Sequence, residues 1–176
     1  MRLPIRIPST EPAGHFPEMI GPRYKDNCDG TITDFLTGLM WQEKYSYPER
    51  GCYIDWQQAE NYVTGLNSSK LAGFSDWRLP NRIEIQSLYE MNRTFESRGR
   101  RYQLHMDPVF EFSYGSCYWT NHRRLSAALG FEFDSGEINW YPIGSLSGSA
   151  RGVRLNMNPF HMLDVFNKTL IADRSV

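Results

Sequence analysis

Arg78-Leu79-Pro80-Asn81 is the stretch of this sequence that constrains the fold most, because it marks the end of one element and the start of another. Pro80 disfavours a helical conformation at the residue before it, so the chain is expected to be extended there. Asn81 is a favoured helix N-cap, and Glu84 follows it at the spacing of a capping box. The stretch therefore predicts a helix from Asn81 to about Met91.

Turn signals upstream predict a small antiparallel meander over residues 24–42. Asp29-Gly30 is typical of a hairpin turn, because glycine adopts positive φ without a Cβ clash, and Thr37-Gly38 gives a second turn. The runs that follow these turns are rich in β-branched and aromatic residues, which favour strands. After the meander, Asp55 is expected to cap a helix that extends to about Leu66.

The downstream half of the chain is predicted to contain a long irregular connection, over residues 92–116, and then more strands. The expected strands are Cys117–Thr120, the two arms of a hairpin at 127–133 and 137–141, and a closing strand at Arg151–Leu155. Helices followed by short antiparallel strands are typical of an α+β domain.

The order of these motifs resembles one known family. The pieces are Asp29-Gly30-Thr31, Thr37-Gly38-Leu39-Met40-Trp41, the stretch from Gly73 to Asn81, Asp107-Pro108-Val109-Phe110 and Tyr118-Trp119-Thr120. Together they are similar to the C-terminal domain of bacterial collagen-like adhesins, the Lcl C-terminal domain family. The resemblance implies a C-type-lectin-like α+β fold, with two helices packed on small twisted antiparallel sheets and long loops. It also implies a ligand-binding module rather than an enzyme, since those adhesin domains bind sulfated polysaccharides.

Length and composition fit a single domain with a further segment on each side. At 176 residues and 40% hydrophobic content, the chain can bury a sizeable core. Residues 24–155 are expected to form the domain, after an extended lead-in over 1–23. Residues 156–176 are expected to be an apolar extension that docks on the domain or on a neighbouring subunit. The net charge of −1 does not indicate binding to a nucleic acid or to an acidic membrane. No apolar run has the length of a membrane span.

The sequence does not decide between cellular compartments. The resemblance implies an extracellular or cell-surface location, yet the N-terminal region lacks the apolar core of a signal peptide, so the protein is either cytoplasmic or has lost its signal. The resemblance also implies a cysteine pair at the positions of Val63 and Gly152, and the joint absence of both is what a reducing compartment permits. Cys28, Cys52 and Cys117 are an odd number, and a bridge between Cys28 and Cys52 stays open.

No motif predicts a cofactor, a metal site or a catalytic centre. The acidic stretch Asp26-Asn27-Cys28-Asp29-Gly30, aligned on a calcium-binding EF-hand loop, puts Lys25 and Leu36 where carboxylates are required. The four histidines have no neighbouring His or Cys at zinc-ligand spacing, and no nucleophile elbow, phosphate loop or dinucleotide fingerprint is present. We therefore expect no bound calcium, no cofactor and no catalytic residue.

Arginine and aromatic residues around the downstream strands are the candidate ligand contacts. Clustered guanidinium groups recognise sulfate, phosphate and carboxylate through paired donors. An aromatic ring beside a Gly/Ser loop can stack on a sugar or anchor a protein. The alternative is that the arginines pair with some of the 20 acidic residues on ordinary solvated faces. The expected contacts are His122, Arg123, Arg124, Trp140, Tyr141 and Arg151.

The sequence supports two functional hypotheses. The first is a non-catalytic module that binds an anionic glycan or another cell-surface polymer, with an affinity that falls steeply with salt. The second is a protein–protein interaction or assembly module of lectin-like fold, which uses its loops and its C-terminal tail.

Overall fold

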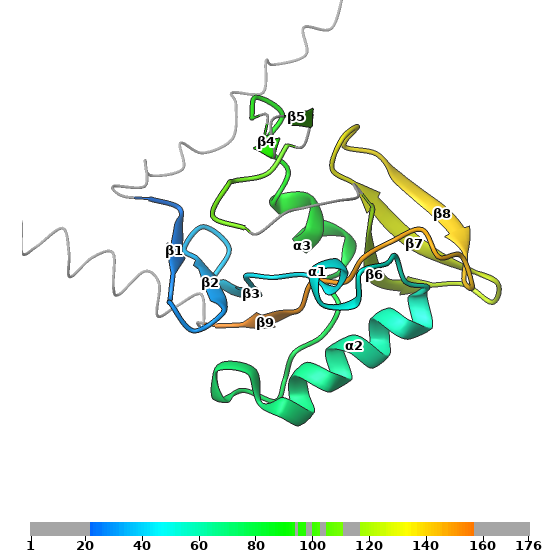
Figure 1. Cartoon of the computed structure of the whole chain (residues 1–176), viewed down its shortest axis with the longest axis horizontal. Helices are drawn as coiled ribbons and strands as arrows, with labels where there is room; N and C mark the ends of the chain where they lie inside the picture. The colour runs from blue at the N-terminus through cyan, green and yellow to red at the C-terminus, as the bar shows by residue number, and fades with distance from the viewer. Residues whose placement is uncertain (1–21, 94, 98–99, 103–104, 111–116, 157–176) are drawn as a thin grey trace, which may run out of the picture.

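The structure is a computed structural model, and it describes residues 22–93, 95–97, 100–102, 105–110 and 117–156. These residues form an α+β arrangement of antiparallel sheets and helices (Figure 1). The expected lead-in and C-terminal extension lie outside the described residues, apart from 22–23 and 156. In chain order the elements are β1 (Tyr24–Asp26), β2 (Thr31–Asp34), β3 (Leu39–Gln42), α1 (Ser46–Arg50), α2 (Trp56–Ser69), the 3-10 turn η1 (Leu71–Gly73), α3 (Arg82–Ser87), β4 (Phe95–Ser97), β5 (Arg100–Tyr102), β6 (Cys117–Arg123), β7 (Ala127–Glu132), β8 (Ile138–Pro142) and β9 (Val153–Leu155).

The first sheet confirms the predicted meander and adds the closing strand to it. Its order is β1-β2-β3-β9, and every pair is antiparallel. Gly30 has a φ of +85° and Gly38 a φ of +70°, so both turns use the left-handed region that glycine tolerates. Trp41 of β3 lies opposite Val153 of β9, which joins the two ends of the domain in one sheet.

The two predicted helices begin where the capping residues indicated. The side chain of Asp55 accepts a hydrogen bond from Gln58 N, and that of Asn81 accepts one from Glu84 N; both helices carry a complete capping box. α2 continues past the predicted end to Ser69. α3 stops at Ser87, short of the predicted Met91, and beyond it Glu90 N donates to His105 O at 2.7 Å. The backbone N–H of Glu90 thus bonds to a carbonyl outside the helix instead of continuing the helical hydrogen-bond pattern.

Four elements were not predicted: α1, η1, β4 and β5. α1 is a single turn whose proline, Pro48, occupies the first helical turn, where no intrahelical N–H donor is needed. The connection over 92–116 was predicted to be irregular, but it contains the short hairpin β4–β5. Residues 111–116 of that connection lie outside the described residues.

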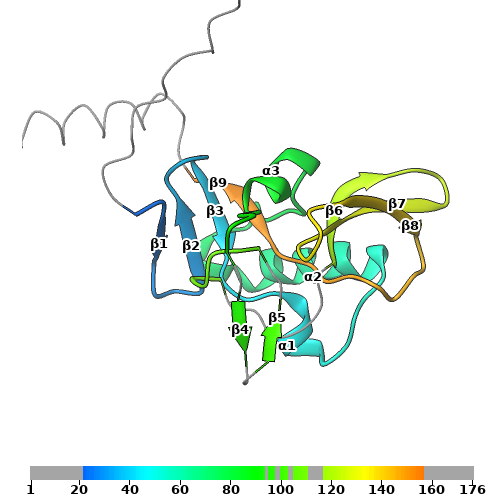
Figure 2. The ribbon, with the colours of Figure 1, turned by 90° about the horizontal axis from the view of Figure 1, so that it is seen from above.

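The second large sheet, β6-β7-β8, separates two hydrophobic cores from each other. Neighbouring residues of a strand point to opposite faces, so Tyr118 enters one core and Trp119 the other. β3 divides its residues in the same way. One core holds the buried side of α2, and the other holds residues of α3 and of the 105–110 segment. Figures 1 and 2 show the two large sheets at opposite ends of the domain, with α2 spanning the region between them.

Candidate functional site

The turn between β6 and β7 projects from the second large sheet. We call residues 121–126 the arginine hairpin; all six are exposed, and Leu125 is fully so. Arg124 N donates to Ala127 O at 2.7 Å and closes the turn. The base of the hairpin is irregular, because the register of β6 against β7 shifts between Trp119 and Arg123.

Buried hydrogen bonds fix this irregular base. The indole Nε1 of Trp56 donates to Thr120 O at 2.8 Å, and the hydroxyl of Thr120 donates to Leu129 O at 2.9 Å. On the other side, Asn121 N donates to Pro80 O at 2.8 Å. Trp56 opens α2 and Pro80 precedes α3, so both helices hold the hairpin. An exposed tip on a rigid base is a common arrangement for recognition loops.

Each arginine of the hairpin lies over a tryptophan ring. The guanidinium carbon of Arg124 is 4.0 Å from the ring centroid of Trp140, which is 40% exposed. That of Arg123 is 5.2 Å from the ring of Trp56. Stacking uses the flat face of a guanidinium and leaves its N–H edges directed outward. Both guanidinium groups thus contact an aromatic ring while their residues remain exposed to solvent.

The alternative of ordinary ion pairing applies to other arginines of the chain. Arg154 pairs with Asp76 at 2.7 Å, which lowers the pKa of that carboxyl, and Arg78 pairs with Glu84 at 2.7 Å. Within the described residues, neither Arg123 nor Arg124 forms an ion pair. Arg123 also acts on the carboxyl of Glu60, where burial raises the pKa and the nearby guanidinium partly offsets the rise.

The structure brings four of the six predicted contacts together and separates two. His122, Arg123 and Arg124 are exposed in the hairpin, and Trp140 lies against Arg124. Tyr141 points to the other face of the sheet from Trp140, because adjacent strand residues alternate. It packs edge-on against Trp119, and its hydroxyl hydrogen-bonds to Glu132; burial and this bond raise its pKa.

Arg151 is the clearest correction to the sequence analysis, because its side chain is fully buried. Its guanidinium donates to Gln42 O at 2.7 Å and to Glu43 O, under a shell of aromatic rings. It therefore ties the chain after β3 to the start of β9 and does not reach the surface of the hairpin. Arg151 is a structural residue.

The acidic side chains before and at the turn stabilise it by accepting hydrogen bonds. Asp29 Oδ1 accepts from Thr31 N and from its hydroxyl, and Asp26 Oδ1 accepts from Cys28 N. Among the described residues, no group of three or more His, Cys, Asp or Glu side chains is arranged to hold a metal ion. In the same part of the chain, no helix is long and apolar enough to cross a membrane.

The three cysteines are all free thiols, so the bridge that the sequence left open between Cys28 and Cys52 is not formed. Those two are exposed. Cys117 is buried in β6, and burial raises the pKa of its thiol.

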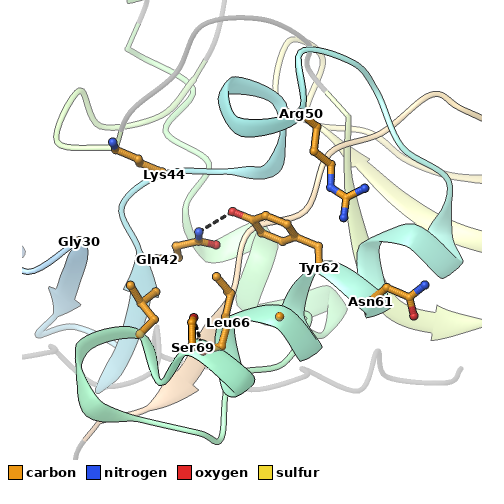
Figure 3. Close-up of a pocket in the computed structure, with 10 residues that line it drawn as sticks. Gly30, Gln42, Lys44, Arg50, Asn61, Tyr62, Leu66 and Ser69 are labelled. Carbon is orange, nitrogen blue, oxygen red and sulfur yellow. Dashed lines mark hydrogen bonds between the residues drawn. The ribbon is translucent and has the colours of Figure 1, made fainter.

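A second feature was missed by the sequence analysis: a cavity of about 350 Å³ between β3, α1 and the C-terminal half of α2. Its lining includes Gln42, Lys44, Arg50, Asn61, Tyr62 and Gly65 (Figure 3). These residues come from three segments that only the fold brings together. The one local signal was Gly65, a glycine inside a capped helix.

Comparison with known proteins identifies the family. No curated protein matches the chain. A family model, described as the Lcl C-terminal domain, matches residues 30–154. This match runs from the first turn of the meander to β9 and includes the arginine hairpin and the cavity. The chain therefore belongs to the Lcl C-terminal domain family.

Proposed function

We propose that this domain is a non-catalytic binding module of C-type-lectin-like fold, and that its arginine hairpin recognises an anionic glycan or another acidic cell-surface polymer. The observation that carries the proposal is the stacking of Arg124 on the half-exposed Trp140 at 4.0 Å, with no ion pair to any described residue. A surface cation that is held by a ring and lacks a carboxylate partner is suited to an external anion.

The chemistry of the hairpin favours planar, bidentate recognition. The N–H edge of a guanidinium matches two oxygens of a sulfate or a carboxylate. His122 lies beside the two arginines, and its imidazole offers a further N–H donor. Arg123 stacks on Trp56 and Arg124 on Trp140, so the two guanidinium groups are supported by different elements. Charges spaced along an extended tip suit a polymer with repeated anionic groups better than a single small anion.

The test is binding of heparin, as a sulfated polysaccharide, and of an unsulfated neutral glycan, measured by isothermal titration at 50 and 150 mM NaCl. Native protein is expected to bind heparin and to lose affinity as salt rises, because exposed charges are screened. The double variant Arg123→Gln, Arg124→Gln should bind at least about tenfold more weakly, a loss of roughly 1.4 kcal/mol. A matched control, Lys25→Gln with Lys70→Gln, removes two exposed charges elsewhere and should change affinity little. An equal loss of heparin affinity in both variants would show that binding depends only on net charge, which would contradict the proposal.

A second candidate function is supported by Leu125, which is fully exposed at the tip between Arg124 and Ser126. Arginine and tryptophan are frequent anchors of protein interfaces, and an exposed leucine beside them fits an apolar pocket of a protein partner. Leu125→Ser distinguishes the two functions. Glycan binding should be unaffected by this change, whereas binding to a protein partner should be lost.

A further inference from the structure

The cavity beside α2 is built from polar and charged groups around a fixed centre. Gln42 Nε2 donates to the Tyr62 hydroxyl at 2.6 Å, and Gln42 Oε1 accepts from Gly152 N at 3.1 Å. Figure 3 shows this pair in the middle, with Arg50 reaching toward α2 from one side and Lys44 on the opposite side. Leu66 and Leu71 complete the lining and give it an apolar part.

The two cations of the cavity have no carboxylate partner in the described part of the chain. Lys44 and Arg50 are both exposed, and neither takes part in an ion pair there. The remaining polar lining consists of neutral groups, among them the side chain of Asn61 and the Tyr62 hydroxyl. The cavity thus carries positive charge with no acidic residue in its lining, although the whole chain has a net charge of −1.

Gly65 lies in the lining of the cavity at an exposed position of α2. A glycine inside a helix costs about 0.5–1 kcal/mol relative to alanine. Here the backbone does not require glycine, since Gly65 is not among the positive-φ residues. Close packing does not require it either, because a Cβ added at this position would meet nothing within 4 Å. A side chain at position 65 would therefore extend into unoccupied space at the wall of the cavity.

The geometry points to a second binding site, in this cavity, for a small organic anion: one sulfate, phosphate or carboxylate group on a hydroxylated body of about monosaccharide size. The volume of about 350 Å³ lies near the lower limit for small-molecule sites, which excludes large ligands. Arg50 or Lys44, which lie on opposite sides of the cavity (Figure 3), binds the anionic group, and Asn61 binds the hydroxylated body.

This site is separate from the arginine hairpin and does not depend on the function proposed for it. Arg123 stacks on Trp56, the first residue of α2, whereas Gly65 lies nine residues further along the helix, roughly 14 Å at 1.5 Å per residue. The hairpin is a projecting tip suited to a polymer, and the cavity is a recess that is partly open to solvent.

The experiment is a two-dimensional NMR titration of the protein with glucose 6-sulfate, glucose 6-phosphate and glucuronate, with glucose as the uncharged control. At least one charged probe is expected to shift the amide signals of Asn61, Gly65 and neighbouring residues, with at least tenfold higher affinity than glucose. Comparison of the three probes identifies the preferred anionic group. Equal affinity of glucose and the charged probes, or shifts confined to the arginine hairpin, would overturn the proposal.

Variants separate the site from the fold and from the hairpin. Lys44→Gln with Arg50→Gln should weaken the charged probe at least tenfold, whereas Arg123→Gln with Arg124→Gln, which removes the same charge, should not. Gly65→Leu should block the cavity and abolish binding. If that variant fails to fold, Gly65→Ala should raise the melting temperature and still weaken the probe. Unchanged binding in the folded Gly65 variants would overturn the proposal, and heparin binding of the hairpin would be unaffected by that result.

Discussion

The hydrogen bond from Trp56 to Thr120 is expected to stabilise both the fold and the position of the arginine hairpin, and Trp56→Phe tests this. The substitution keeps an aromatic ring at the start of α2 but removes the indole N–H. That N–H donates at 2.8 Å to the carbonyl of a fully buried residue, at the place where the ladder between β6 and β7 is irregular.

Two effects determine how far Trp56→Phe lowers the free energy of unfolding. A buried carbonyl that loses its donor costs about 1–3 kcal/mol. The smaller ring also buries less apolar surface at a position that is only 7% exposed, which adds about 1 kcal/mol. The free energy of unfolding should therefore fall by roughly 2–4 kcal/mol. Because Arg123 lies over the same ring and phenylalanine keeps part of this cation–π contact, heparin affinity should also fall, but by less than the ~0.5–1 kcal/mol of a complete exposed contact.

Urea unfolding followed by circular dichroism measures the first effect, and heparin titration measures the second. Trp140→Phe is the matched control for the unfolding measurement alone, because Arg124 lies over this ring in the proposed binding site. The ring is 40% exposed, and within the described residues its indole N–H has no hydrogen-bond acceptor. The control should stay within about 0.5 kcal/mol of the native protein. A Trp56→Phe protein as stable as this control would refute the reasoning, because the bond to Thr120 would then contribute nothing.

Three further predictions concern other buried or paired groups. Of the three cysteines, the two exposed ones should react quickly with a thiol reagent, and Cys117 should react only after unfolding; rapid labelling of three thiols in native protein would contradict its burial. Burial raises the pKa of Glu84, but hydrogen bonds from Arg78 and the Asn81 N–H outweigh that effect and leave the pKa lowered. The ionised carboxylate therefore stabilises the fold above its unfolded pKa, near 4.3, and this contribution is lost as pH falls through the folded value. Glu84→Gln should cost about 1 kcal/mol at pH 7 and almost nothing at pH 2.5, as measured by urea unfolding at both values. Arg151→Met should lower the free energy of unfolding by about 3 kcal/mol, since it removes donors to two backbone carbonyls, and an unchanged melting curve would show that these contacts are dispensable.

Local signals in the sequence were sufficient for the caps, the turns and most strands. Asp55 and Asn81 cap their helices through residues only three positions away, so no knowledge of the fold was needed. Gly30 and Gly38 likewise determine their turns locally. The end of α3 was misplaced because it depends on a backbone bond from Glu90 to a residue fifteen positions away, and periodicity does not reveal such a partner.

The candidate site was only partly predictable, for two different reasons. The separation of Trp140 from Tyr141 follows from strand alternation, so the sequence already contained the information that they face opposite ways. The burial of Arg151 did not follow from the sequence, since its acceptors at Gln42 and Glu43 are more than a hundred residues away. The charged cavity was missed for the same reason, because β3, α1 and α2 form it jointly.

The presence of β1 and β9 at the two edges of one sheet has a consequence for how this domain presents its hairpin. The described chain enters at β1 and leaves just after β9, where Asn156 N donates to Gly38 O at 3.0 Å. The arginine hairpin belongs to the sheet at the opposite end of the domain (Figures 1 and 2). A support attached through either flank therefore leaves the hairpin directed away from it. Under the proposed function, several copies displayed on one support would face the same polymer together, and their high effective concentration would raise the overall affinity above that of a single site.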